Sequence, residues 1–469
     1  MKKPLCLILA LIFLSALLFG CAAESLPVHV EGAVFGGNSN DSIPVELSFD
    51  VRWLTEGDNT VYNAELARFS ALLCADVYFR EKDLAKGTQN RVLIDGSDAA
   101  LYTPTALLTK LGFSDVRYIE SFKLKEYALD TNDSVTLTAG YLDYDDTYDV
   151  FVIALRGCFS VQEWLSVFDP GAAEGSYSEY TGEHPEWTDT RRYKGAGIAA
   201  NRAEELINAF ISENDAPERE NVILVTGHSR GGILANMIGA DMELNSNAKT
   251  FTYTFSTMPV TTDTEAPGYK TVFNIFDPND YYVNTLPFGN ESFFRYGRDI
   301  SLSLNASDEA LNALDALKGR DGYADIGPDA ISEYKELFGK KFPERASLYD
   351  TLTLTERFSL ESEANARFDE MQTLIGANGL GLDTFVSAAE PVKTADGSYE
   401  VTLSYCGGAL LWGYSKTLAY GAPAYDAFIS LFKNDEAACR IADFLAANAG
   451  AITSGHLLAN TYILSGFGA

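Results

Sequence analysis

Basic residues are scarce in this sequence of 469 residues. It contains 35 lysines and arginines against 66 aspartates and glutamates, so its formal net charge is −31. A surface of this sign repels nucleic acid and is not drawn to anionic lipid by electrostatics. The acidic residues are spread along the chain, which favours an ordinary solvated surface over an acidic tail. Nucleic acid is therefore not expected as a partner.

Cysteine is also scarce, with six residues, and long hydrophobic runs are absent after the N-terminal segment. Cys74, Cys158, Cys406 and Cys439 show neither a CxxC pair nor metal-ligand spacing, so no metal site is expected. A disulfide between Cys406 and Cys439 stays open, but four thiols in so long a chain do not make a disulfide scaffold. No segment after residue 20 is long and apolar enough to span a membrane.

The first twenty residues have the pattern of a signal peptide. Two lysines precede an apolar run over 5–19, which is too short for a comfortable transmembrane helix. The stretch "LFGC" at 18–21 resembles the lipobox of bacterial lipoproteins, which are cleaved before the cysteine and acylated on it. This resemblance implies export and anchoring of Cys21 to the outer face of the bacterial cell membrane. A plain secretory signal cleaved near Ala23 is the alternative.

Strand and helix patterns alternate along the first 300 residues. Residues 21–44 are small and polar and are expected to form a tether. Hydrophobic patterning predicts strands at 45–53, 134–142, 149–155, 250–256 and 270–276, and helices at 63–79 and 201–212, the latter capped by Asn201. Strands that alternate with helices predict a three-layer α/β domain with a mostly parallel central sheet.

The pattern changes after residue 300. Residues 301–391 are mostly helical in periodicity, with an apolar stripe formed by Ala364, Phe368, Met371 and Ile375. We interpret 301–391 as a helical cap inserted into an α/β core that occupies 45–300 and 392–469. A strand at 400–405 and a helix at 436–449 are expected in the second part of that core.

The stretch "NVILVTGHSRGGILANMIG", residues 221–239, carries the main functional motif. A β-branched run is followed by G-x-S-x-G at 227–231 and then by an apolar-periodic helix. Glycines in this pattern let a strand reverse tightly into a helix and expose the serine. We therefore predict that Ser229 is a nucleophile, with a purely structural turn as the alternative.

A serine nucleophile needs a base and a group that orients the base. The sequence has four histidines, and α/β-hydrolases place theirs after the serine and the acid along the chain. Only His456 fits that order, because His29, His184 and His228 all precede Ser229. The acid should follow a strand after the elbow, where "FDPNDYYVNTLP" offers Asp277 and Asp280. Either aspartate is also compatible with a simple turn.

Several of these stretches together resemble the class 3 (fungal-type) triacylglycerol lipases. They are "ALRGCFSVQEW" at 154–164, "YKGAGIAANRAEEL" at 193–206, "VTGHSRGGILA", "NIFDPNDYYVNTLP", and the terminal pair His456 and Tyr462. The resemblance implies an α/β-hydrolase fold and favours Asp280 as the triad acid. It also places the oxyanion hole at the backbone N–H groups of Arg230 and Cys158, where the family has serine or threonine instead of cysteine.

The resemblance implies a serine hydrolase for lipid or acylglycerol esters that needs neither a metal nor an organic cofactor. An esterase, thioesterase or phospholipase would use the same residues, so the substrate class stays open. A non-catalytic surface lipoprotein that binds a ligand on the same scaffold is the rival from another class. Leu410, Leu411 and Trp412 are read as core packing, with contact to an acyl chain as the alternative.

Overall fold

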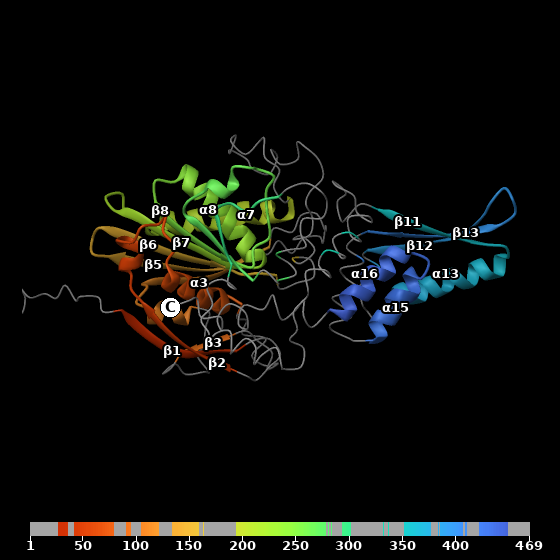
Figure 1. Cartoon of the computed structure of the whole chain (residues 1–469), viewed down its shortest axis with the longest axis horizontal. Coiled ribbons are helices and arrows are strands. Elements are labelled where there is room, and N and C mark those ends of the chain that lie inside the picture. Colours follow the sequence, from red (N-terminus) through yellow and green to blue (C-terminus); the bar gives the residue numbers. More distant parts are fainter. Residues whose placement is uncertain are drawn as a thin grey trace, which may run out of the picture.

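A computed structural model describes residues 27–35, 42–78, 91–94, 105–121, 134–158, 163, 194–277, 280, 283, 293–301, 332, 336, 351–376, 383, 385–406, 409 and 422–448. Within these ranges the chain forms a central sheet of seven strands, a small N-terminal sheet and a C-terminal lobe (Figure 1). The candidate residues Cys158, Ser229, Asp277 and Asp280 lie in loops that follow strands of the central sheet.

The central sheet has the strand order β10-β9-β8-β7-β6-β5-β4, and its five strands from β6 to β10 are parallel. Its strands are β4 (Asp115–Ser121), β5 (Val135–Tyr144), β6 (Tyr148–Leu155), β7 (Glu220–His228), β8 (Lys249–Phe255), β9 (Val272–Phe276) and β10 (Arg298–Ser301). Every residue of β6 after Tyr148 is buried, as expected for a parallel strand that is covered on both faces. The mostly parallel sheet predicted from the sequence is confirmed.

Helices cover both faces of this sheet (Figure 1). On one face lie α7 (Lys194–Asn214) and α8 (Arg230–Asn245), and on the other lies α3 (Ala64–Asp76). Successive side chains of β6 alternate between the two cores: Ile153 packs in the core shared with α7 and α8, and Val152 packs in the core shared with α3. The three-layer α/β architecture is therefore confirmed. Short elements complete this part: α2 (Arg52–Thr55), α5 (Ala106–Lys110) and the 3-10 turn Ala266–Gly268.

Two helix starts show how the helices of this domain are capped, and the second tests the predicted cap at Asn201. The side chain of Asn63 caps α3 by accepting hydrogen bonds from the N–H groups of Glu65 at 2.9 Å and Leu66 at 3.2 Å. Asn201 is not a cap, because α7 already begins at Lys194 and Asn201 lies inside it. The sequence interpretation placed this helix start seven residues too late because small apolar residues at 195–200 continue the helix without a marked amphipathic pattern.

The expected tether over 21–44 is wrong for the part of it that the structure describes. Residues Val28–Phe35 form β1, which pairs antiparallel with β2 (Ser42–Phe49) and with β3 (Arg91–Ile94). The strand VHVEGAVF is rich in apolar residues, and it was missed because the glycine- and asparagine-rich residues after it dominate the composition of 21–44. His29 lies in β1 and its Nδ1 is 3.2 Å from the hydroxyl of Ser48.

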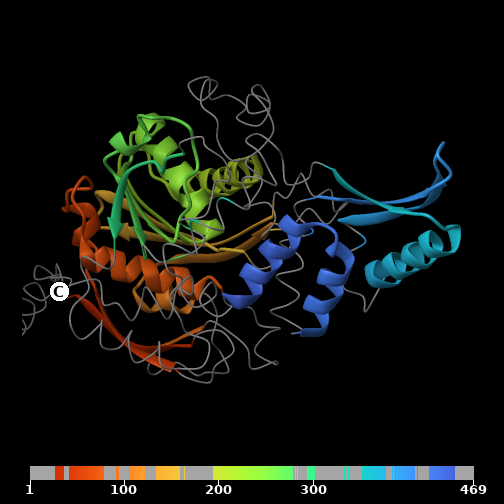
Figure 2. The ribbon, with the colours of Figure 1, turned by 45° about the vertical axis from the view of Figure 1, so that its right-hand side comes forward.

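The C-terminal lobe consists of a three-stranded antiparallel sheet, in the order β11-β13-β12, and three helices (Figure 2). Its elements are β11 (Leu352–Phe358), α13 (Glu361–Gly376), β12 (Val386–Lys393), β13 (Tyr399–Tyr405), α15 (Ala422–Phe432) and α16 (Glu436–Ala447). Side chains tie its elements together. Arg367 of α13 donates to the carbonyls of Ser430 and Leu431 at the end of α15, and the hydroxyl of Tyr405 donates to Asp435 at the start of α16.

This lobe corrects two expectations. The helical interpretation of 301–391 holds for α13 but is wrong for β11 and β12, which are strands. The strand at 400–405 exists as β13, but it pairs with β11 and β12 and is not part of the central sheet. The pairing of β11 with β13 spans α13 and β12 in the chain, and periodicity within one segment does not reveal such a pairing.

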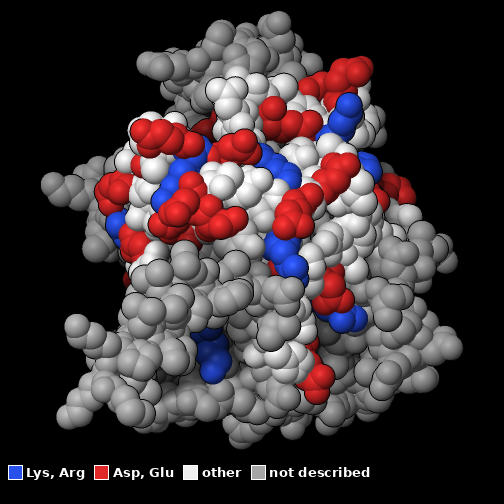
Figure 3. Space-filling view, turned by 90° about the vertical axis from the view of Figure 1, so that its left-hand side faces the viewer, with Lys and Arg blue, Asp and Glu red and all other residues white. Residues whose placement is uncertain are grey.

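The acidic excess is distributed over the surface among basic side chains. Figure 3 shows the face at the left of Figure 1, where acidic and basic side chains are interspersed and acidic ones predominate. Arg219, for example, forms ion pairs with Asp143 at 2.5 Å and with the buried Asp149 at 3.1 Å. This distribution agrees with the expectation of a solvated acidic surface.

Candidate functional site

The turn between β7 and α8 holds Ser229 in a strained backbone conformation. Its φ is 58° and its ψ is −125°, a combination that costs about 1–3 kcal/mol for a residue other than glycine. The N–H of Ser229 donates to the carbonyl of Phe255 at 2.9 Å, and its own carbonyl accepts from Ile233 at 3.0 Å. The strand–turn–helix context of the G-x-S-x-G motif is thus confirmed. The role of Ser229 as a nucleophile stays a prediction.

The two motif glycines let α8 approach the sheet. A Cβ on Gly227 would lie 2.1 Å from the carbonyl oxygen of Gly231, and a Cβ on Gly231 would lie 2.1 Å from that of Leu155. Backbone atoms cannot move aside as a flexible side chain can. Any side chain at either position would therefore push α8 away from β6 and β7 and relax the turn that carries Ser229.

Four neighbouring parallel strands end at the same edge of the central sheet. Cys158 follows the end of β6, Ser229 follows β7, Ser256 follows β8, and Asp280 follows β9. In parallel α/β sheets the carboxyl ends of adjacent strands form the crevice where ligands bind. The topology thus brings the predicted oxyanion residue, nucleophile and acid to one edge.

Both candidate acids are buried at this edge of the sheet, and Asp280 is the more deeply buried of the two. Asp280 is fully buried, at 0% exposure, and its Oδ2 accepts a short hydrogen bond from the hydroxyl of Ser256. Asp277 is 8% exposed, and its carbonyl accepts the N–H of Asp280 at 2.9 Å. Ser256 itself has φ 53°, a second strained serine at this edge of the sheet. The sequence analysis missed Ser256, although it ends a predicted strand beside the elbow.

Cys158 lies at the end of β6 with a protonated thiol. Burial raises the pKa of its thiol well above the ordinary value. A thiol in this state is neither a good nucleophile nor a metal ligand at neutral pH. The preceding Gly157 packs directly on the elbow, since a Cβ there would lie 2.7 Å from the carbonyl oxygen of His228. The backbone that carries Cys158 therefore runs beside the turn that carries Ser229.

His228 precedes Ser229 in the elbow, and its ring contacts Tyr78. It is 4% exposed, and its Nδ1 lies 3.0 Å from the hydroxyl of Tyr78. The same hydroxyl would be 1.8 Å from a Cβ on Gly157, so Tyr78 packs under both the elbow and the end of β6. Burial raises the pKa of Tyr78, which keeps its phenol neutral. The sequence contained no signal for Tyr78, because it follows α3 and meets His228 only in the folded chain.

A buried polar cluster lies next to these residues and was also missed. Arg156 and Glu163 form an ion pair at 3.4 Å, and their side chains are only 1% and 4% exposed. The hydroxyl of Ser134 donates to Glu163 at 2.8 Å, and the carbonyl of Ser134 accepts from Arg230 Nη2 at 2.8 Å. An arginine at the end of an otherwise apolar strand was the available signal for this cluster.

Several predicted residues lie outside the described ranges. They are His456, His184, Cys21, and the segment Leu410, Leu411 and Trp412. Their assignments stay predictions, and the base of the triad therefore rests on chain order.

The described cysteines are all free thiols. Cys406 and Cys439, the pair left open as a disulfide, are both unbridged, as are Cys74 and Cys158. Burial raises the pKa of Cys74 to about 12 and also raises that of Cys439, so both thiols are protonated at neutral pH.

None of the described helices is long and apolar enough to cross a membrane. No three histidine, cysteine, aspartate or glutamate side chains of the described part are grouped so that they could hold a metal ion.

Comparisons with known proteins add only structural similarities. No family model and no curated protein sequence matches this chain. Rhizomucor miehei triacylglyceride lipase is 17% identical, with a TM-score of 0.31 over 48% of this chain and 76% of that chain. The Lip2 lipase of Yarrowia lipolytica is 16% identical, with a TM-score of 0.33 over 50% and 77%. M37 lipase is 12% identical, with a TM-score of 0.31 over 48% and 70%. Because these TM-scores are below 0.5, the conclusions rest on the geometry of the chain itself.

Proposed function

We propose that this protein is a serine hydrolase of the α/β-hydrolase fold that cleaves carboxylic esters. Ser229 is the nucleophile, His456 the base, and Asp280 the acid that orients the base. The observation that carries the proposal is the strained backbone of Ser229 at the carboxyl end of a central parallel strand. Such strain persists where the surrounding structure over-determines it, and it clusters at active sites. The carboxylate of Asp280 is buried and hydrogen-bonded. This supports its role as the acid of the triad, because a triad acid is typically buried and fixed by hydrogen bonds.

The chemistry follows from these roles. Ser229 Oγ attacks the ester carbonyl carbon while His456 takes its proton, and the same proton then passes to the leaving alcohol. Water attacks the acyl-serine with His456 again as the base, which releases the acid and restores Ser229. The N–H groups of Arg230 and Cys158 bind the oxyanion, where loss of one donor typically costs about 3 kcal/mol. This mechanism requires neither a metal nor an organic cofactor.

The substrate class we propose is a lipid or acylglycerol ester. The resemblance of the motif segments to class 3 lipases supports it, whereas the elbow geometry alone is equally compatible with an esterase, thioesterase or phospholipase. In Figures 1 and 2 the C-terminal lobe lies on the right, at the end of the central sheet toward which β6 runs. We infer that this lobe, which contains the described part of 351–391, borders the ester-binding crevice and shapes the preference for acyl-chain length.

We also propose that the mature protein begins at an acylated Cys21 and is held at the outer face of a bacterial cell membrane. The support is the "LFGC" stretch after an apolar run with two preceding lysines. Mass spectrometry of the purified protein from the membrane fraction tests this directly. An unmodified N-terminus at another residue, such as one near Ala23, contradicts it.

The decisive experiment combines active-site labelling with an ester panel. A fluorophosphonate probe should label the wild-type protein and should fail to label Ser229→Ala and His456→Ala. A series of p-nitrophenyl esters from acetate to palmitate then reports the chain-length preference. Absence of both labelling and turnover in the folded wild-type protein would support the non-catalytic ligand-binding alternative. Near wild-type turnover in either variant would refute the triad.

A further inference from the structure

The residue after the proposed nucleophile is an arginine whose side chain is buried. Arg230 is 1% exposed, and its Nη2 donates to the carbonyl of Ser134 at 2.8 Å. Among the described residues, its Nε has no hydrogen-bond partner. A guanidinium is always charged, and moving it from water into the protein interior costs free energy unless a counter-charge and hydrogen bonds compensate. No carboxylate of the described part forms an ion pair with Arg230, so its burial calls for an explanation.

A second buried arginine is linked to the first through two residues. Arg230 bonds to Ser134, the hydroxyl of Ser134 bonds to Glu163 at 2.8 Å, and Glu163 pairs with Arg156 at 3.4 Å. In the part of the chain that the structure describes, the cluster thus joins two buried cations and one buried carboxylate. Arg156 also lies 3.8 Å from the carboxylate of Glu120, whose side chain is 38% exposed. Water screens such a carboxylate more than it screens the buried groups, so the buried side chains of Arg230, Arg156 and Glu163 together carry a net positive charge.

This charge is placed behind the two proposed oxyanion donors. Arg230 supplies one N–H from its own backbone at the start of α8. Arg156 lies two residues before Cys158, which supplies the other, and the N–H of Arg156 is fixed by the carbonyl of Thr136 at 3.0 Å. The positive charge therefore belongs to the same short segments that bind the negative charge formed during the reaction.

We propose that the buried guanidinium of Arg230, held in one network with Arg156 and Glu163, stabilises the oxyanion electrostatically from behind its backbone donors. The side chain does not touch the substrate, and it acts through fixed charge in a water-excluded region, where charges act more strongly than in water. The inference rests on the proposed function of Ser229. It adds a residue whose charge, and not only its N–H group, sets the rate.

Cys158 provides a reporter of this field that does not depend on hydrolysis. Burial raises the pKa of its thiol; of the nearby charges, Arg230 and Arg156 oppose that rise, while Glu163 adds to it. Removing the cation at 230 should therefore make the thiolate rarer, and removing the anion at 163 should make it more frequent.

The first experiment measures alkylation of Cys158 by iodoacetamide, followed by mass spectrometry of the Cys158 peptide, at a pH below the thiol pKa. Arg230→Met should slow alkylation by about three- to tenfold, and Glu163→Gln should speed it by a similar factor, which corresponds to half to one pKa unit. Cys158→Ser identifies the peptide signal. A general loosening of the site would speed alkylation of Cys158 in both variants. A change of the alkylation rate in the same direction in both variants therefore overturns the proposal. If Arg230→Met does not fold, Glu163→Gln decides alone: unchanged or slower alkylation overturns the proposal.

The second experiment measures kcat and KM on p-nitrophenyl butyrate, with folding checked by circular dichroism. Arg230→Met should lose about ten- to a hundredfold, mainly in kcat, because the interaction develops in the transition state. Arg230→Lys keeps the charge and should recover most of that loss. Arg219→Met, which removes a partly buried arginine at the opposite end of the sheet, should leave kcat within about twofold. Equal losses in the Met and Lys variants, or a loss confined to KM, overturn the electrostatic role.

The two proposals fail in different ways. If the folded wild type neither hydrolyses esters nor reacts with the fluorophosphonate probe, the serine hydrolase proposal fails, while the alkylation contrast still reports whether Arg230 sets a positive field. If hydrolysis depends on Ser229 but Arg230→Met keeps full kcat, only the field proposal fails.

Discussion

The central sheet and the sheet of the C-terminal lobe bury their strands in different ways. β6 is buried along both faces after its first residue, because α3 covers one face and α7 and α8 cover the other. β11 alternates, with Glu356 buried on the side of α13 while Thr355 and Arg357 are exposed on the opposite side. Polar side chains such as Thr254 and Asn274 are buried within the central sheet, where they are hydrogen-bonded to each other at 2.8 Å, whereas the sheet of the lobe exposes polar groups on its uncovered face.

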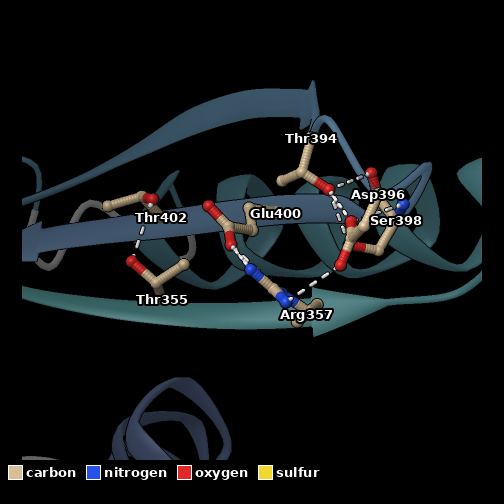
Figure 4. A network of polar contacts seen from close by, with 7 residues as sticks. All are labelled: Thr355, Arg357, Thr394, Asp396, Ser398, Glu400 and Thr402. Carbon is tan, nitrogen blue, oxygen red and sulfur yellow. Dashed lines mark hydrogen bonds and ion pairs between the residues drawn. The ribbon is translucent and has the colours of Figure 1, made fainter.

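This difference predicts where substitution of a polar side chain should change activity strongly. In the central sheet the functional candidates Ser229, Ser256 and Asp280 all follow strand ends, where the layers of helices leave the edge open. In the lobe the polar groups of the exposed face lie mid-strand. Figure 4 shows Arg357 bonded to Glu400 and Asp396, and Thr355 beside Thr402 across the ladder. Polar substitutions should therefore affect activity at the edge of the central sheet and affect little on the exposed face of the lobe.

The largest expected loss of activity at the edge of the central sheet is at Asp280. Asp280→Asn should lower kcat/KM by about 10³ to 10⁴, because the base would lose the carboxylate that fixes its tautomer. Asp277→Asn, three residues earlier in the same loop, is the matched control and should lose less than about tenfold. Both are measured on p-nitrophenyl butyrate. If Asp277→Asn is the costlier change, the acid of the triad is Asp277.

The next effect concerns stability and lies inside the lobe. Arg367 donates to both carboxylate oxygens of Glu356 at 2.8–3.1 Å, with the two side chains only 4% and 5% exposed. Glu356→Leu would leave the buried guanidinium without its main counter-charge and should cost about 3–5 kcal/mol. Hydrogen exchange of peptides from 352–405 measures the loss of protection. The double variant Glu356→Leu/Arg367→Met should be less destabilised than the single one, and greater destabilisation would contradict the ion-pair explanation.

A smaller effect is expected at Cys158, where the backbone N–H matters more than the thiol. Cys158→Ala keeps the N–H and should lose about tenfold or less in kcat/KM. Cys158→Thr adds a hydroxyl, a stronger donor than a thiol, and should match or exceed the wild type. The same soluble ester serves for both variants. A Cys158→Ala variant as inactive as Ser229→Ala would mean that the thiol takes part in the chemistry.

The smallest effect is expected on the exposed face of the lobe. Arg357 bonds to Glu400 at 2.6 Å and to Asp396 at 3.3 Å, but all three side chains are substantially exposed. Exposed pairs of this kind contribute about 0–1 kcal/mol, so Arg357→Ala should change the free energy of unfolding of the lobe by no more than this. Hydrogen exchange of the same 352–405 peptides makes the result comparable with Glu356→Leu. Equal destabilisation by the two variants would remove the contrast between the buried and the exposed face.

Local pattern was sufficient for much of the central domain. Continuous apolar runs predicted β6 and the strand before the elbow, because strands buried on both faces need such runs. The G-x-S-x-G motif predicted the turn at Ser229, because glycine at 227 and 231 is required for the close approach of α8. Asn63 was expected within a helix that its side chain caps, and α16 lies close to its predicted range. Each of these features depends on neighbours within a few residues.

Contacts between distant segments decided the rest. The sequence by itself determined a parallel α/β domain with a serine elbow and named two aspartates as acids. Only the tertiary structure paired β13 with β11, joined Val28–Phe35 to β3, and placed Asp280 under Ser256. It also joined Arg230 to Ser134, 96 residues away. Hydrogen bonds and ion pairs across such separations depend on where whole elements pack, and no periodicity or spacing within one segment records that.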